Sequence, residues 1–180
     1  MAKSIEYTQY LKNGDIVLTY NKKNLFSRLI AKCSKVKGND FKASHAILVL
    51  STDFGLMAES AFPGGVKIKK YHRYKKGKNV VYILRIKDFS NEQYQLLVKS
   101  AVEKEGLKYS LLQVFALLIK YIFKVKAIGD VSKRAMVCSE YVSQIFKDST
   151  MDLFPGFSSV NVSPQMFFTC PRLFLIKILE

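Results

Sequence analysis

Ser90-Asn91-Glu92-Gln93 opens a segment in which the pattern of the chain changes from extended to helical. The Ser90 hydroxyl can accept a hydrogen bond from the amide of Gln93 while the Gln93 side chain reaches back, which is the capping box that begins many helices. Gly106 supplies the left-handed backbone that ends such a helix. The sequence therefore predicts an amphipathic helix whose apolar face recurs at helical spacing: Tyr94, Leu97, Val98, Ala101 and Val102.

The chain before this segment is dominated by short extended runs. Runs of β-branched and aromatic residues bounded by Gly, Asn, Asp and Pro are typical of strands. Between the first two runs, apolar residues recur at helical spacing and predict a helix over Asn24 to Lys35. The predicted strands are Ile16 to Tyr20, His45 to Leu50, Gly55 to Ser60, Val66 to Lys70 and Val80 to Ile86.

The chain after this segment is predicted to be helical. Ser110-Leu111-Leu112-Gln113 repeats the capping pattern ahead of a helix to about Lys124, whose near-uniform apolarity predicts burial on most sides. A third apolar stripe at helical spacing follows, at Cys138, Tyr141, Val142, Ile145 and Phe146. Strands followed by helices predict an α+β fold in which helices pack on an antiparallel sheet.

The composition is that of one globular domain with a large excess of positive charge. A chain of 180 residues removes about 70% of its surface from water on folding, so a sizeable core is available. No internal repeat or Pro-rich linker divides it, which predicts a single domain over residues 1–180. With 29 Lys and Arg against 14 Asp and Glu, the net charge of +15 predicts an anionic partner or surface.

The cysteines and the apolar runs indicate in which cellular compartment the protein is expected. Cys33, Cys138 and Cys170 cannot all pair within one molecule, and none forms a Cys-x-x-Cys motif, so we expect reduced thiols and no metal site. Met1 to Lys12 lacks the apolar run of a signal peptide. The longest apolar run, Leu111 to Ile119, is far shorter than the ~20 residues that cross a bilayer. The expectation is a cytoplasmic protein.

Two side chains could carry nucleophilic chemistry. His45 is the first residue of a predicted apolar strand, where its ring either is hydrogen-bonded within the core or faces a cleft. Cys138 stands where the third helical stripe begins, and the positive end of a helix dipole stabilises a thiolate. The alternative for Cys138 is a buried structural thiol, the commoner state of a lone cysteine.

Glu59 lies on the strand that follows His45, across a short turn. A loop of Ser51 to Asp53 would place Glu59 directly opposite His45, and a loop of Thr52 to Phe54 would place it diagonally on the same face. A two-residue loop would place the two side chains on opposite faces. Glu59 can therefore orient the imidazole, or it can point to solvent from an edge strand.

Short motifs along nearly the whole chain resemble the permuted papain-like amidases of the YaeF/YiiX type, which are related to the lecithin:retinol acyltransferase group. Histidine comes first and cysteine last, the reverse of ordinary NlpC-type and papain-like enzymes. The motifs are Asn13-Gly14-Asp15-Ile16-Val17-Leu18, Ser44-His45-Ala46, Ala58-Glu59-Ser60 with Gly65-Val66, Gly106-Leu107-Lys108-Tyr109-Ser110, Val137-Cys138-Ser139-Glu140-Tyr141-Val142 and Val162-Ser163-Pro164-Gln165-Met166.

The resemblance implies a circularly permuted papain-like (NlpC-type) fold and a cysteine hydrolase without a cofactor. In it, Cys138 corresponds to the nucleophile, His45 to the general base and Glu59 to the residue that orients the imidazole. Tyr109 and Ser139 correspond to substrate contacts, and Asp15 to a structural turn. The implied substrate holds an amide or ester bond of a peptide, acyl-amino acid or lipid, and an acyltransferase remains the alternative.

The positive charge suggests where this protein binds. The run from Lys67 to Lys78 holds seven cations, and His72 within it is expected to be a solvated loop residue. Cations near an anionic bilayer favour peripheral membrane contact, so a catalytically silent lipid- or anion-binding module is a further alternative. Nucleic acid is not expected as a partner because no helix-turn-helix, zinc finger or aromatic RNA-binding motif is present. The oligomeric state is left open.

Overall fold

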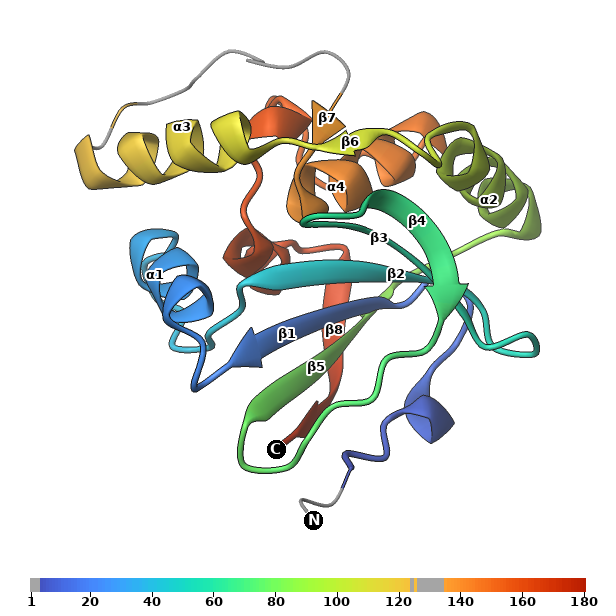
Figure 1. The fold of residues 1–180 in the computed structure, drawn as a ribbon. Helices are drawn as coiled ribbons and strands as arrows, with labels where there is room; N and C mark the ends of the chain where they lie inside the picture. Colours follow the sequence, from blue (N-terminus) through green and yellow to red (C-terminus); the bar gives the residue numbers. More distant parts are fainter. Residues whose placement is uncertain (1–3, 124, 126–134) are drawn as a thin grey trace.

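The computed structural model describes residues 4–123, 125 and 135–180. It contains an antiparallel sheet of six strands in the order β4-β3-β2-β1-β5-β8, packed with helices, which confirms the predicted α+β class (Figure 1). The strands are β1 (Ile16–Asn21), β2 (His45–Ser51), β3 (Leu56–Ala61), β4 (Gly65–Lys70), β5 (Asn79–Ile86) and β8 (Leu173–Leu179). The helices are α1 (Leu25–Cys33), α2 (Asn91–Glu103), α3 (Leu111–Phe123) and α4 (Cys138–Asp148).

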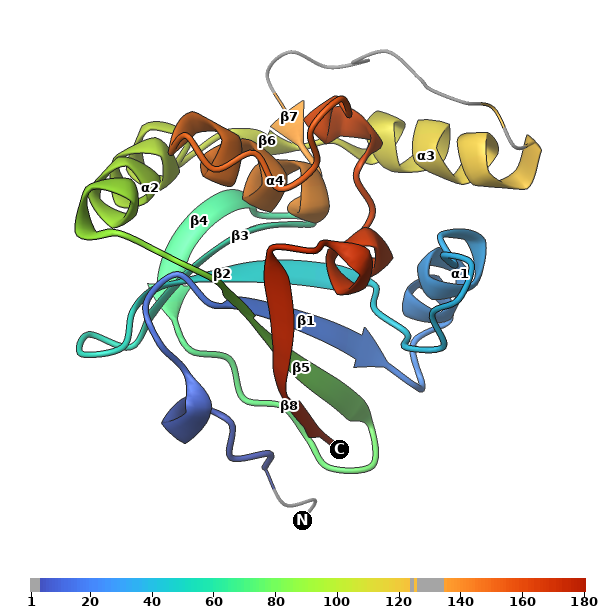
Figure 2. The same cartoon turned by 180° about the vertical axis from the view of Figure 1, so that it is seen from behind.

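Both faces of the sheet are covered, which explains why the central strands are almost continuously apolar. On one face, Leu18 and Leu48 belong to a buried cluster with Leu97 of α2 and Val142 and Ile145 of α4. Figures 1 and 2 show α2 and α4 over this side of the sheet and the N-terminal segment on the other. That segment supplies the second buried cluster, in which Ile5, Tyr7 and Leu11 pack with Val17, Ile47 and Val49.

The hydrogen bonds predicted at the starts of two helices are confirmed. In α2, Ser90 accepts from the amide of Gln93, and the Gln93 side chain accepts from the amide of Ser90, so the capping box forms as predicted. At the start of α3, Ser110 accepts from the amide of Gln113 over 3.1 Å. The predicted end of that helix at about Lys124 lies outside the described residues.

The structure corrects the predictions for two apolar segments. The apolar run Leu173–Leu179 was not predicted as a strand, and it forms β8, which pairs with β5 at the edge of the sheet. The predicted burial of α3 on most sides is wrong, since Leu112, Phe115 and Ile119 are exposed. The reason is its position: α3 extends beyond the sheet, so the face that does not pack on α1 and on Val137 meets solvent (Figure 1). Among the described residues, no helix is long and apolar enough to cross a bilayer.

Two further short strands align the region that follows α2. β6 (Lys108–Tyr109) pairs in parallel with β7 (Ala135–Met136), directly before α4. Ser60 of β3 donates to the carbonyl of Met136 over 2.6 Å, which ties β7 to the main sheet. The start of α4 is thereby fixed relative to β3 and to Tyr109.

Asp15 forms an ion pair that holds the N-terminal turn against β5. Its carboxylate is 1% exposed and accepts from Arg85 through Nε at 2.8 Å and Nη2 at 2.7 Å. The same carboxylate accepts from the amide of Lys12 over 2.7 Å, and Arg85 also donates to the carbonyl of Tyr10. This agrees with the structural role expected for Asp15.

Asp15→Ala is expected to lower the free energy of unfolding by about 3 kcal/mol, because it leaves the Arg85 guanidinium without its bidentate partner. Urea denaturation followed by circular dichroism measures the change. The matched control is Asp40→Ala, since Asp40 pairs with Lys35 at 3.5 Å on the open surface and such a pair contributes about 0.5 kcal/mol or less. Equal losses in the two variants would contradict a structural role for the Asp15 pair.

Candidate active site

His45 and Glu59 lie on neighbouring strands and contact each other directly. Leu48 pairs with Ala58 and Val49 with Met57, so Glu59 is diagonal to His45 on the same face of the sheet. The diagonal arrangement is one of the three that the sequence allowed. In the structure, a register shift between Val49 and Ser51 contributes to this alignment of the two strands. Nε2 of His45 lies 2.7 Å from Oε2 of Glu59. A solvent-facing Glu59 is excluded, since the residue is only 2% exposed.

His72 is not the solvated loop residue that the sequence predicted. Its Nε2 lies 3.1 Å from the same Oε2 of Glu59, and its side chain is only 30% exposed. Lys69 of β4 forms an ion pair with the other carboxylate oxygen, Oε1. His72 lies two residues beyond the end of β4, and its contact with Glu59 of β3 places a second imidazole beside the buried carboxylate.

These neighbours keep Glu59 ionised despite its burial. Desolvation alone would raise the pKa of the carboxyl group. The hydrogen bonds from His45 and His72, the charge of His45 and the hydrogen bond from Lys69 outweigh it, and the pKa of Glu59 lies well below its usual range. Glu59 is therefore a buried negative charge shared by three basic side chains.

His45 also interacts with Cys138, the third side chain singled out from the sequence. Burial alone would lower the pKa of His45, but the negative charge of the Cys138 sulfur, a side-chain hydrogen bond to that sulfur and the contact with Glu59 raise it to about 10. The imidazole is thus held between a sulfur and a carboxylate.

Cys138 is the first residue of α4, as the apolar stripe predicted. Val137 precedes it in an extended conformation, and the amide of Val137 donates to Oε2 of Glu140 over 3.2 Å. The first amides of a helix lack intrahelical acceptors and carry the positive end of its dipole, so they favour negative charge at this position. The residue is 5% exposed, and Cys33, Cys138 and Cys170 are all free thiols.

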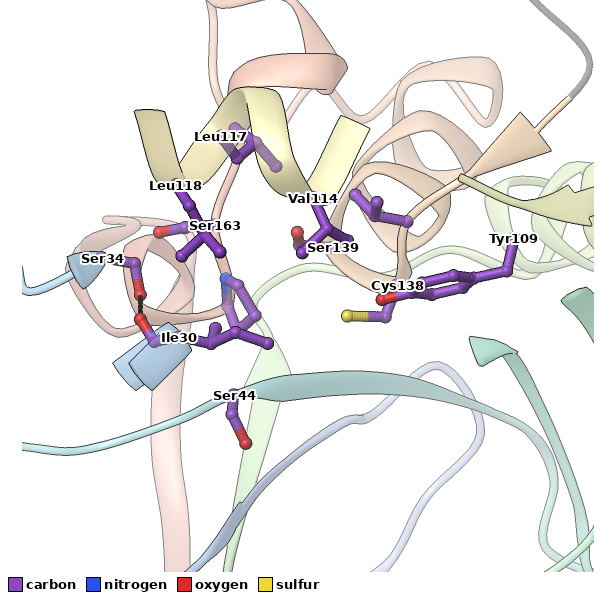
Figure 3. Close-up of a pocket in the computed structure, with 12 residues that line it drawn as sticks. Ile30, Ser34, Ser44, Tyr109, Val114, Leu117, Leu118, Cys138, Ser139 and Ser163 are labelled. Carbon is purple, nitrogen blue, oxygen red and sulfur yellow. Dashed lines mark hydrogen bonds between the residues drawn. The ribbon is translucent and has the colours of Figure 1, made fainter. Parts of the chain in front are cut away.

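Tyr109 and Ser139, the two expected substrate contacts, both border the space beside the Cys138 sulfur. They line the same small cavity of about 40 Å³, into which the sulfur points (Figure 3). Burial, and then the negative charge of Cys138, raise the pKa of Tyr109, so its hydroxyl stays protonated and able to donate. The Ser139 hydroxyl donates to the carbonyl of Val162 over 2.7 Å, which ties α4 to the segment after it.

The small cavity is apolar and adjoins a larger cleft that holds the charged groups. Val114, Leu117 and Leu118 of α3 form much of the small cavity. The larger cleft has a volume of about 750 Å³ and is lined by His45, Glu59, Lys69, His72 and Tyr109, among others. Ile30, Ser44 and Tyr109 border both spaces, so the cavity beside the Cys138 sulfur adjoins the cleft that His45 lines.

His72 and Lys69 are the residues of this site that the sequence analysis missed. For Lys69 a signal existed: β3 and β4 form a hairpin in which Glu59 pairs with Lys67, so Lys69 is diagonal to Glu59 on the same face. No pattern places His72, because it lies beyond the end of β4, where the path of the chain is set by packing. Within residues 4–123, 125 and 135–180, no group of three or more His, Cys, Asp or Glu side chains is placed to hold a metal ion.

No protein-family model matches the sequence, and no curated protein matches it.

Proposed function

We propose that this protein is a cysteine hydrolase with a circularly permuted papain-like fold, which cleaves an amide or ester bond through an acyl group carried on Cys138. The observation that carries the proposal is the position of His45. Its Nε2 lies 2.7 Å from Oε2 of Glu59, and its ring is near enough to the Cys138 sulfur for negative charge on that sulfur to raise the pKa of the imidazole. The three residues come from α4, β2 and β3, and they supply a nucleophile, a proton carrier and a group that orients it. The order of histidine before cysteine is that of the permuted amidases that the sequence resembles.

In the proposed mechanism, the resting pair is a thiolate on Cys138 and an imidazolium on His45. With a pKa of about 10, His45 is protonated at neutral pH. Its positive charge and the amide end of α4 both stabilise negative charge on the Cys138 sulfur. Glu59 accepts from Nε2 of the ring and balances its charge, so the imidazolium is stabilised from the side opposite the sulfur.

In the proposed reaction, the thiolate attacks the carbonyl carbon, and the carbonyl electron pair moves onto the oxygen. The oxyanion is stabilised by the free amides at the start of α4, and Tyr109 supplies a further donor beside the sulfur. The tetrahedral species then expels the amine or alcohol, which takes its proton from His45. Water, deprotonated by the now neutral His45, attacks the thioester, releases the acid and restores the thiolate and imidazolium.

Alkylation with iodoacetamide tests the resting pair without any assumption about substrate. An ordinary thiol is about 3% thiolate at pH 7, so we expect Cys138 to alkylate about tenfold faster than Cys33 of α1, although Cys33 is the more exposed. Mass spectrometry of one digest reports both rates. His45→Ala should reduce the Cys138 rate and leave that of Cys33 unchanged.

The outcome that overturns the proposal is equal alkylation of Cys138 and Cys33 in folded protein, with no effect of His45→Ala. A catalytically silent module would be indicated by fast alkylation without turnover of any ester or amide. If an added amine or alcohol captures the acyl group in place of water, the same residues act as an acyltransferase.

A further inference from the structure

One face of α3 presents a stripe of large apolar side chains to solvent. Leu112 is 68% exposed, Phe115 58% and Ile119 53%, and their spacing of three and four residues aligns them along the helix. The stripe continues at Ile122 and Phe123, which are 59% and 73% exposed. Contiguous exposed apolar patches of this kind mark interaction surfaces on proteins that otherwise bury such residues.

Helix α1 extends this apolar surface. It packs against α3 and exposes Leu25, Phe26 and Leu29 (Figures 1 and 2). Phe26 and Phe115 line the same cleft as His45, so the cleft of the candidate active site borders both helices. We call the exposed apolar side chains the α1/α3 face, which consists of Leu25, Phe26, Leu29, Leu112, Phe115, Ile119, Ile122 and Phe123.

Positive charge adjoins the α1/α3 face. A hollow of about 750 Å³ beside α1 is bordered by Leu25 and Leu29 of the face and by four cations: Arg28, Lys32, Lys35 and Lys42. The acidic residue of this lining is Asp40, which lies 3.5 Å from Lys35. Within the described part of the chain, Arg28, Lys32 and Lys42 have no carboxylate within ion-pair distance, so the hollow is complementary to an anion.

We propose that the α1/α3 face and the hollow beside it bind the surface of an anionic lipid bilayer. Apolar side chains bordered by Lys and Arg are the combination that enters the boundary between headgroups and acyl chains, where the cations contact lipid phosphates. A second copy of the chain fits this surface poorly, because each copy carries a net charge of +15 and would bring the same four cations to the interface. Docking in this orientation places the cleft that Phe26 and Phe115 line beside the lipid.

Sedimentation with vesicles tests the charged part of the surface. Wild type should bind vesicles of phosphatidylcholine with 30% phosphatidylglycerol and bind pure phosphatidylcholine far more weakly. Arg28→Ser/Lys32→Ser should weaken binding about 25-fold, since each cation near an anionic bilayer contributes about fivefold. Lys75→Ser/Lys76→Ser removes the same charge from the loop between β4 and β5, and it should change binding by less than about threefold. Equal losses in the two double variants would show binding through net charge and overturn the proposal.

A matched pair of phenylalanine variants tests the apolar part. Phe115→Ser should weaken vesicle binding at least about tenfold, because the ring leaves the bilayer boundary. Phe54→Ser is the control, since Phe54 is 69% exposed in the turn between β2 and β3, on the side of the molecule away from α1 and α3 (Figure 1). Equal effects of the two variants, or no binding by wild type, would overturn the proposal. So would a wild-type dimer in sedimentation velocity that Phe115→Ser converts to a monomer, because the face would then bind a second copy.

Discussion

Cys138→Ala is expected to abolish hydrolysis of p-nitrophenyl acetate above the uncatalysed rate, and His45→Ala to lower kcat/KM at least about 10³-fold. The sulfur forms the bond to the acyl carbon, so no other side chain in the site replaces it. The imidazole holds the thiolate in its charged form and carries the proton to the leaving group, and the loss of either member of such a pair removes most of the acceleration.

Two controls show whether the loss of activity in Cys138→Ala and His45→Ala comes from the missing side chain. Cys33→Ala is the matched control, because it removes a thiol of α1 outside the contacts made by His45, and it should retain full activity. Circular dichroism and urea midpoints should show that Cys138→Ala and His45→Ala remain folded. Turnover that survives in folded Cys138→Ala would contradict the thioacyl mechanism, since the acyl group would then have no sulfur to occupy.

The secondary structure was largely predictable because its signals are local. The capping box at Ser90 and the apolar stripes of α2 and α4 depend on residues within a few turns. The structure confirms them except at Val102, which the stripe of α2 included and which is 53% exposed near the end of that helix. The five predicted strands are likewise confirmed, with ends that differ by a residue or so. The strand β8 was missed because its apolar run lacks alternation, and it becomes a strand only by pairing with the edge of β5.

Three members of the candidate site, Cys138, His45 and Glu59, were predicted from the sequence, but Lys69, His72 and the geometry of the site were not. The sequence narrowed Glu59 to three positions relative to His45, and the register shift after Val49 selects the diagonal one. His72 could not be placed, since its contact with Glu59 depends on the path of the chain beyond β4. The exposure of α3 could not be decided from the sequence either. An apolar helix has the same sequence pattern whether its second face packs against a neighbour or meets solvent.

The buried carboxylate determines how the activity should depend on pH. Negative charge on the Cys138 sulfur and then the contact with Glu59 raise the pKa of His45 to about 10, so the proton on the ring is retained at neutral pH and lost only as the pH rises towards that value. The stabilisation from this raised pKa is complete below about 6.5, the value of a free histidine, and disappears as the pH passes through about 10. Since the pKa of Glu59 is lowered, its own contribution to stability is present above the usual range of a carboxyl group and lost on acidification.

Glu59→Gln is expected to shift the basic limb of the pH profile of kcat/KM down by about one to three pH units and to lower kcat/KM at pH 8 about 100-fold or more. The glutamine keeps the size and one acceptor of the carboxylate but removes the negative charge, so the imidazolium loses its proton at lower pH and the thiolate loses its positive neighbour. A stopped-rate assay with p-nitrophenyl acetate across pH 5 to 10 measures the basic limb of the profile.

Glu103→Gln is the control, because Glu103 is exposed on α2 and the substitution removes the same charge far from the site. An unchanged basic limb of the kcat/KM profile in Glu59→Gln would show that Glu59 only supports the fold. A shifted limb in a variant whose urea midpoint equals that of wild type would show that the charge of Glu59 acts through His45.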